Sequence, residues 1–216
     1  MKTLIDEIID SLFIITILVA WLYIVYILIK YKINPIDQID LGLKNFERKL
    51  KNIEIVRAGR MDELNKKILQ WAKDRELDKK GTVEAQTIKT VEELSELVKA
   101  VCKDDREEII DAIGDVHVTL VIGNMLDTNT EMDALSCIGS DEDEYTKEQL
   151  LEQLLECSRY VLFFKYIREL IALTIKALYN VCKYYQFDYA DCVESAYNVI
   201  KNRKGKVVDG QYIKEE

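Results

Sequence analysis

The spacing of apolar residues constrains this chain most. From Met61 to about Lys201 apolar side chains recur every three or four positions, and no convincing stretch alternates with a period of two. On a helix this spacing puts the apolar side chains on one face, which has to be buried against a neighbour. With 216 residues, 49% of them hydrophobic, the chain can bury one substantial core. The pattern predicts an all-α domain folded as a helical bundle.

The expected helices of this domain are separated by glycine, by acidic helix starts and by one polar segment. The segment from Asp127 to Gln149 is rich in acids and is expected to be a solvated, mobile loop. Gly205 and Gly210 bracket a tail that can form a hairpin. The predicted helices cover residues 61–77, 82–102, about 104–126, 150–185 and 189–201, with residues 160–182 as a buried amphipathic stretch.

A separate apolar stretch lies near the start of the chain. Leu12 to Ile29 is eighteen residues without a charge, a length that is just sufficient to cross a bilayer. A signal peptide or a buried core helix are the alternatives, but Asp6 and Asp10 are unlike the basic start of a signal peptide. Basic residues follow the stretch, so the positive-inside rule predicts a single-pass membrane protein with its main domain in the cytoplasm.

Residues 33–60 connect this span to the helical domain. Pro35, the only proline, ends the first helix because it lacks an amide proton. Leu43, Phe46, Leu50 and Ile53 then form a short apolar seam, which suits either a helix lying on its own domain or a dimerising or membrane-surface stalk. The expected organisation is an anchor over residues 1–32, a linker and stalk over 33–60, and a helical domain over 61–216.

Composition excludes several classes of function. The net charge is −9 and no long basic run occurs, so nucleic acid is not an expected partner. The five cysteines are scattered and include no C-x-x-C pair, which argues against a disulfide framework or a zinc knuckle. They are expected to be reduced thiols of a cytoplasmic domain.

Two clusters of carboxylates lie at helical spacing in neighbouring predicted helices. Residues three or four apart on a helix project from the same side, and crowded carboxylates there are destabilising unless a cation offsets their charge. Four or more such acids on two helices can hold a hard divalent cation. The alternative is that both sets lie on the solvated faces of amphipathic helices. The clusters are Glu92, Glu93 and Glu96 in the first helix, and Glu108, Asp111 and Asp115 in the second.

The surroundings of the two clusters differ. In the first helix an apolar stripe through Ile88, Leu94 and Val101 leaves the three glutamates off the buried face. In the second helix the sequence after Asp115 is apolar nearly all round, so its acids are expected at the rim of the core, where a carboxylate needs a partner. His117, the only histidine, points to another side and is expected to be a hydrogen-bonded core or rim residue.

Around these acids the chain resembles the MazG-like branch of the all-α nucleotide pyrophosphohydrolases. The signature of that family is an E-x-x-E pair followed, after a dozen or more residues, by E-x-x-D. Residues 86–97 are similar to its first motif helix, 111–116 to its second, and 195–206 to the closing helix and basic tail of phage and Gram-positive members. The resemblance covers residues 61–126 and 178–214, whereas about 127–171 looks like an insertion.

The resemblance implies a homo-oligomeric, Mg²⁺-dependent enzyme, with Mn²⁺ as a second possibility. The substrate is a nucleoside triphosphate, cleaved between the α and β phosphates into a monophosphate and pyrophosphate. Glu93, Glu96, Glu108, Asp111 and Asp115 are the implied metal ligands, Glu92 the implied general base, and Lys201, Arg203 and Lys204 the implied phosphate-binding residues.

The second motif departs from the family pattern at one position. Ala112 stands where the family has its glutamate, so Glu108 or Asp111 has to substitute for it. This departure supports the alternative function, a membrane-anchored nucleotide-sensing or interaction module without turnover. Trp71 lies on an apolar stripe and is expected in the core, although it could also stack on a base.

Overall fold

The structure is a computed structural model, and it describes residues 58–128, 132 and 144–215, together with isolated helical positions at 18, 21–23, 26 and 44. The chain divides into two units, residues 1–55 and 56–216. In the first unit the described side chains include Trp21 and Tyr23, both exposed. The predicted membrane span over Leu12–Ile29 and the predicted linker and stalk fall mostly outside the described residues.

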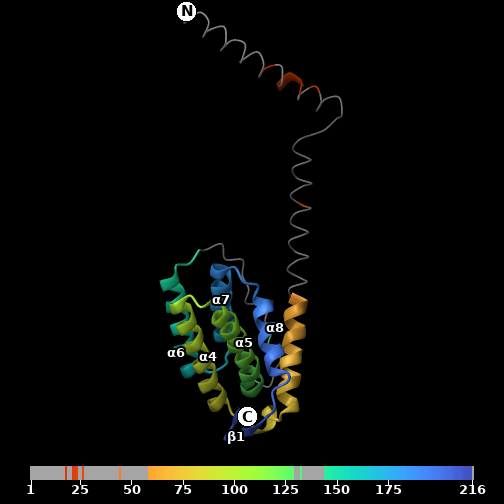
Figure 1. Cartoon of the computed structure of the whole chain (residues 1–216), viewed down its shortest axis with the longest axis vertical. Helices are drawn as coiled ribbons and strands as arrows, with labels where there is room; N and C mark the ends of the chain where they lie inside the picture. Colours follow the sequence, from red (N-terminus) through yellow and green to blue (C-terminus); the bar gives the residue numbers. More distant parts are fainter. Residues whose placement is uncertain are drawn as a thin grey trace, which may run out of the picture. The chain divides into compact units, whose positions relative to one another are not determined.

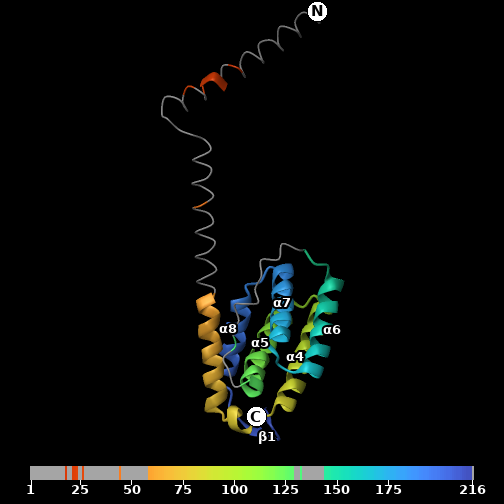
Figure 2. The ribbon, with the colours of Figure 1, turned by 180° about the vertical axis from the view of Figure 1, so that it is seen from behind.

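The second unit is an all-α bundle with a small hairpin at its end (Figure 1). Residues 58–74 are helical and lead into the short helix α3 (Leu77–Lys80). The longer helices then run side by side, as both Figure 1 and the view from behind in Figure 2 show. They are α4 (Val83–Lys103), α5 (Arg106–Thr128), α6 (Lys147–Phe164), α7 (Arg168–Tyr185) and α8 (Tyr189–Ile200), followed by β1 (Gly205–Val208) and β2 (Gln211–Lys214).

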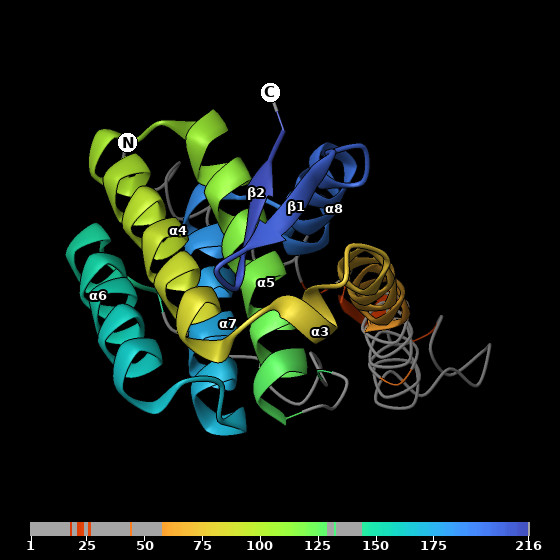
Figure 3. The same ribbon diagram turned by 90° about the horizontal axis from the view of Figure 1, so that it is seen from below.

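Helix α5 is the central element of the bundle. Seen from below, it lies between α4 on one side and α8 on the other; α6 lies beyond α4, and α7 is seen behind α4 and α5 (Figure 3). From Val116 to Met125 every residue of α5 is buried. In the described part of the chain α5 is the one helix long and apolar enough to cross a membrane, but 78% of its apolar window is buried inside the domain. Its apolar character is therefore that of a core helix.

Polar side chains occupy part of the buried face of α4. Gln86 donates from Nε2 to the Thr119 carbonyl at 3.1 Å, and the Thr90 hydroxyl lies 2.7 Å from that of the buried Tyr166. The predicted buried face of this helix was wrong at two positions. Ile88, expected to be buried, is 60% exposed, and Glu93, expected to lie off the buried face, is 5% exposed. Hydrogen-bonded threonine and glutamine side chains can be buried at modest cost, which hydrophobicity alone does not reveal.

The predicted continuous helix over residues 150–185, with its buried stretch 160–182, was wrong because the chain breaks between α6 and α7. Lys165 ends α6 with a φ of 62° and a ψ of −132°, a conformation that an α-helix does not contain. The next residue, Tyr166, is completely buried, and its backbone amide donates to Asp127. A β-carbon on Gly123 would lie 2.0 Å from the Tyr166 ring, so glycine makes room for this ring.

The last residues of the region predicted as a loop over 127–149 belong to the helical bundle. Thr146 caps α6 in a capping box with Gln149, and Lys147 forms an ion pair with Asp104 at 2.6 Å. Helix α6 packs along α4, so part of the segment interpreted as an insertion covers the core. Residues 129–131 and 133–143 lie outside the described residues.

The hairpin at the chain's end confirms the expectation from its two glycines. β1 and β2 pair antiparallel, with Val208 opposite Gln211. Asp209 and Gly210 have φ values of 49° and 82°, as a tight two-residue hairpin turn requires. The turn lies against the start of α4, where the Thr82 amide donates to the Gly210 carbonyl at 3.3 Å.

Candidate functional site

Glu93 is the buried acid of the first cluster. Its Oε1 lies 2.6 Å from Lys89 Nζ, and the same ammonium lies 3.1 Å from Oε2 of Glu92. Burial raises the pKa of the Glu93 carboxyl, and the ion pair with Lys89 offsets part of that rise. Glu96 and Glu92 add like charge that raises the pKa of Glu93 further. The first acidic cluster therefore contains one buried carboxylate, Glu93, between the exposed Glu92 and Glu96.

Asp115 is the corresponding acid on α5. Burial raises its pKa to about 7, and the carboxylates of Glu93 and Asp111 raise it as well. Arg203 and Lys89 oppose this rise, because their positive charges favour the ionised form. Asp115 thus interacts electrostatically with residues of α4, of its own helix and of the segment after α8. This is the point where the two acidic motifs and the basic tail meet.

Close packing of α8 on α5 explains how the basic tail reaches this point. A β-carbon on Gly114 would lie 2.4 Å from the Cys192 carbonyl oxygen and 2.6 Å from the Ala196 β-carbon. Glycine at position 114 therefore lets the two backbones approach beside Asp115. The turn that follows α8 then carries Arg203 into electrostatic range of that carboxyl.

Most of the other predicted site residues lie at the surface. Glu108 is in the first turn of α5, where its amide donates to the Asp105 side chain at 3.4 Å. Lys201 Nζ donates to Asn198 at 2.7 Å, so this ammonium is engaged along its own helix end. The exposed members of the predicted set are Glu92, Glu96, Glu108, Asp111, Lys201 and Lys204, whereas Arg203 is half-buried.

The donor set fits a cation in part. Glu93 and Asp115 are carboxylates on adjacent helices whose pKa values are raised by burial and by neighbouring acids, so a positive charge beside them would be favoured. Among residues 58–128, 132 and 144–215, however, no three acidic, cysteine or histidine side chains are gathered closely enough to hold a metal ion. A full coordination shell would therefore need rotation of exposed acids such as Glu96 or Asp111.

Ala112 has a clear structural role. It is 6% exposed and lies in the core, one position beyond the exposed Asp111. A glutamate at this position would have to extend from the core to reach the acids, whereas Asp111 already interacts electrostatically with Asp115. This interaction favours Asp111 as the acid that replaces the family's glutamate in the second motif.

His117 is a core histidine, as predicted. Its two ring nitrogens lie 2.7 Å from the Tyr189 hydroxyl and 2.8 Å from Asn65 Oδ1, and the ring is completely buried. Burial lowers the pKa of His117 to about 3, so the ring is neutral. Trp71 is also in the core, with its indole nitrogen donating to the Ile200 carbonyl at 2.8 Å.

Sequence reasoning missed Lys89. It lies four residues before Glu93 and three before Glu92, a helical spacing that predicts ion pairs. It also missed Arg75, whose guanidinium lies 4.6 Å from the Trp71 ring centroid and donates to backbone carbonyls of the basic tail. No local motif marks Arg75, because its partners in the tail, the carbonyls of Lys201 and Arg203, are more than 120 residues away.

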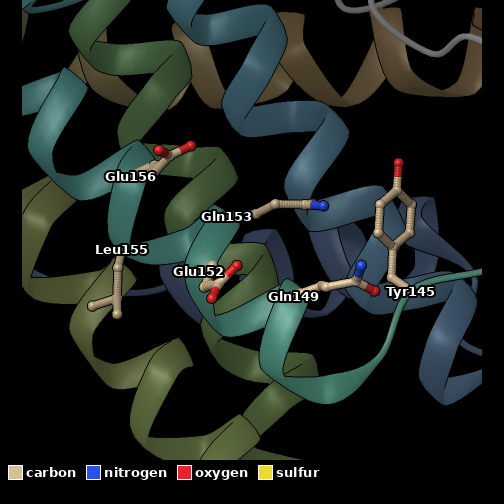
Figure 4. A pocket seen from close by; sticks show the side chains of 6 residues that line it. All are labelled: Tyr145, Gln149, Glu152, Gln153, Leu155 and Glu156. Atoms are coloured by element: carbon tan, nitrogen blue, oxygen red, sulfur yellow. The ribbon is translucent and has the colours of Figure 1, made fainter.

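A groove of about 450 Å³ lies elsewhere, along α6. Figure 4 shows that its side chains come from α6 and the residues just before that helix. It contains none of the predicted site residues, and one of its members, Gln153, accepts a hydrogen bond from Asn180. The groove is lined by Tyr145, Gln149, Glu152, Gln153, Leu155 and Glu156.

Comparison with known proteins identifies one similar phage protein. A stretch of 62 residues, 29% of this chain, is 44% identical to an uncharacterized 18.2 kDa protein in the rep-hol intergenic region of Haemophilus phage HP1 (strain HP1c1). The match covers 38% of the length of that protein. No protein-family model matches the chain. No solved structure matches it.

Proposed function

We propose that this protein is a Mg²⁺-dependent nucleoside triphosphate pyrophosphohydrolase, which releases a nucleoside monophosphate and pyrophosphate. Three features support the proposal: the order of the two acidic motifs, the basic tail that follows α8, and the all-α fold. The observation that carries most weight is the place of Asp115 among charged groups from three segments. It interacts electrostatically with Glu93 of α4, with Asp111 of its own helix and with Arg203 of the tail, and burial with the two acids raises its pKa to about 7. Perturbed carboxyl groups of this kind concentrate at functional sites.

In this proposal the carboxylates of Glu93, Asp111 and Asp115 hold the cation, with Glu96 and Glu108 as further ligands. Bound Mg²⁺ or Mn²⁺ would neutralise the phosphates and acidify a water molecule. Glu92 is exposed beside Glu93 and can accept a proton from that water. Arg203, and with it Lys201 and Lys204, would bind the outer phosphates, since arginine matches phosphate oxygens with two parallel donors.

Lys89 has a specific role in the proposed cycle. Its ammonium bridges Glu92 and Glu93 at 3.1 and 2.6 Å and so compensates their charge in the free protein. A cation bound at Glu93 would compete with this ammonium for the same carboxylate. Lys89 would then be released toward the phosphates of the substrate. Replacement of Lys89 by Gln is therefore expected to tighten Mg²⁺ binding.

A second function is favoured by two observations. Glu93 is already paired with Lys89, and the motif position 112 is a buried alanine. Both fit a nucleotide-sensing or interaction module that keeps the fold and has lost turnover. The two functions differ in one measurable property, since a sensor binds nucleotide without forming pyrophosphate.

The cellular setting belongs to the same proposal. The uncharged stretch over Leu12–Ile29 and the basic residues after it favour a single-pass membrane protein whose catalytic domain faces the cytoplasm. Homo-oligomerisation follows only from the resemblance to the MazG-like family. Labelling of an introduced cysteine from outside intact cells, before and after lysis, tests the orientation.

The deciding experiment measures pyrophosphate release by the full-length protein in detergent micelles, against a panel of nucleoside triphosphates with and without Mg²⁺. Glu93→Gln is expected to abolish metal-dependent release. Glu84→Gln is the matched control, because it makes the same change at an exposed position of the same helix. Nucleotide binding by a folded protein without product would instead establish the sensor module.

A further inference from the structure

The backbone carbonyl of Arg203 is held by two donors. Arg75 Nη2 donates to it at 2.8 Å, and the Tyr212 hydroxyl donates to it at 3.1 Å. Arg75 Nε in turn donates to the Tyr212 hydroxyl at 3.3 Å, which leaves the hydroxyl proton for the carbonyl. The Arg203 amide donates to the Ile200 carbonyl at 2.8 Å. Arg203 is thus fixed through its backbone on both sides of its α-carbon.

Arg75 is itself held in place. Its guanidinium lies 4.6 Å from the Trp71 ring centroid, and its Nη1 donates to the Trp71 carbonyl at 3.3 Å. Trp71 contacts the Tyr212 ring edge-on at 5.2 Å. Since Trp71 is buried, it anchors both donors to the core. A planar guanidinium with five donors can make these contacts at once, whereas a lysine ammonium cannot.

Among the three basic residues of the tail, Arg203 is the one whose charge acts on Asp115. Lys201 is engaged with Asn198, and Lys204 is exposed. Arg203 is half-buried and lies within electrostatic range of Asp115. The direction of its side chain depends on the turn that Arg75 and Tyr212 hold. In the proposed function these carboxylates hold a cation. An arginine beside them can then contact a phosphate that is bound to the same cation.

We propose that Arg75 is a positioning residue, which sets the direction of Arg203 toward the carboxylates so that Arg203 binds the pyrophosphate part of the substrate. The inference rests on the proposed function and deepens it. Arg75 acts through the backbone of Arg203 and makes no contact with substrate. Loss of Arg75 therefore weakens phosphate binding only while Arg203 is present.

The test measures binding of inorganic pyrophosphate to the full-length protein in MgCl₂ by calorimetry. Arg75→Gln and Arg203→Gln are each expected to weaken binding by about tenfold, and the double variant by no more than Arg203→Gln alone, because residues acting through one another are not additive. Tyr212→Phe, a milder change that removes one of the two donors, is expected to weaken it by about threefold.

Arg106→Gln is the matched control. Arg106 also donates to a backbone carbonyl, that of Tyr185 at 2.8 Å, and lies 4.5 Å from the Phe187 ring centroid. It makes the same kinds of contact from the first residue of α5, and these partners lie at the end of α7 and just after it. Its loss is expected to leave pyrophosphate affinity unchanged.

Two results would overturn the inference, and they differ. Unchanged affinity in Arg75→Gln and Tyr212→Phe, with loss in Arg203→Gln, would refute the positioning role and leave the proposed function standing. Absence of pyrophosphate binding by the wild-type protein would also refute the inference, and the pyrophosphate-release assay described above then decides the proposed function separately. Amide hydrogen exchange across residues 201–205 supplies an independent readout, because faster exchange in Arg75→Gln than in Arg106→Gln is expected if Arg75 fixes the turn.

Discussion

Two polar clusters are centred two residues apart on α5, at Asp115 and His117, and they differ in how their charges are balanced. At His117 each ring nitrogen has a partner, Asn65 or Tyr189, and the ring is neutral; of this cluster, the amide nitrogen of Asn65 is buried without a hydrogen-bond partner among the described residues. At Asp115 burial and the neighbouring acids raise the pKa, and Arg203 and Lys89 oppose them. Hydrogen bonds between neutral groups stabilise a fold, whereas an excess of like charge favours binding of a cation.

The largest effect is expected at the charged cluster. Asp115→Asn keeps the size of the side chain and removes its charge, so metal-dependent pyrophosphate release is expected to fall by about 10³-fold or more. The free energy of unfolding should not fall, because like-charge repulsion is relieved. Steady-state kinetics and urea unfolding of the same preparation check both. Full turnover in Asp115→Asn would remove the basis for assigning chemistry to this cluster.

The neutral cluster should show the opposite behaviour. His117→Leu breaks both hydrogen bonds of a completely buried ring, which is expected to lower the free energy of unfolding by about 2 to 4 kcal/mol. Pyrophosphate affinity should be unchanged in the folded protein. Equilibrium urea denaturation and calorimetry measure the two quantities. A large loss of pyrophosphate affinity in folded His117→Leu would show that the two clusters are coupled.

The two clusters are expected to change the free energy of unfolding in opposite directions as pH rises. The pKa of Asp115 is about 7 in the fold against 3.8 as its ordinary value, so the folded chain binds more protons between these values and Asp115 lowers stability as pH rises through them. The pKa of His117 is about 3 against 6.5, so the unfolded chain binds more protons and stability rises with pH across that window.

Variants test these signs directly. Between pH 4 and 6.5, Asp115→Asn is expected to make the slope of unfolding free energy against pH more positive, and His117→Leu to make it more negative. Urea unfolding at several pH values in that window gives the slopes. Slopes that change in the same direction in both variants would contradict the difference between the clusters.

The smallest effect is expected from a single hydroxyl. Tyr189→Phe removes the hydrogen bond to His117 but keeps the edge-on contact between the two rings, whose centroids are 5.5 Å apart. The free energy of unfolding should fall by about 1 kcal/mol. Thermal and urea unfolding measure it, with Tyr184→Phe at an exposed position as the control.

The sequence predicted those helices and turns that depend on residues close together in the chain. The helical pattern predicted α4, α5 and α8 to within a few residues, and Asp209-Gly210 has the composition of a tight hairpin turn. The break at Lys165 was missed, because its cause is the burial of Tyr166 against Gly123, 43 residues away in sequence. Helical periodicity continues across such a break and does not reveal it.

The candidate site divides in the same way. The sequence by itself determined that two helices carry acids at helical spacing, that a basic tail follows, and that His117 belongs to the core, because these follow from spacing and composition. Tertiary structure alone decided that Glu93 is buried and paired with Lys89, and that Arg203 comes to Asp115 through the close packing at Gly114. Burial and electrostatic interaction depend on which helices pack together, and that is a property of the whole fold.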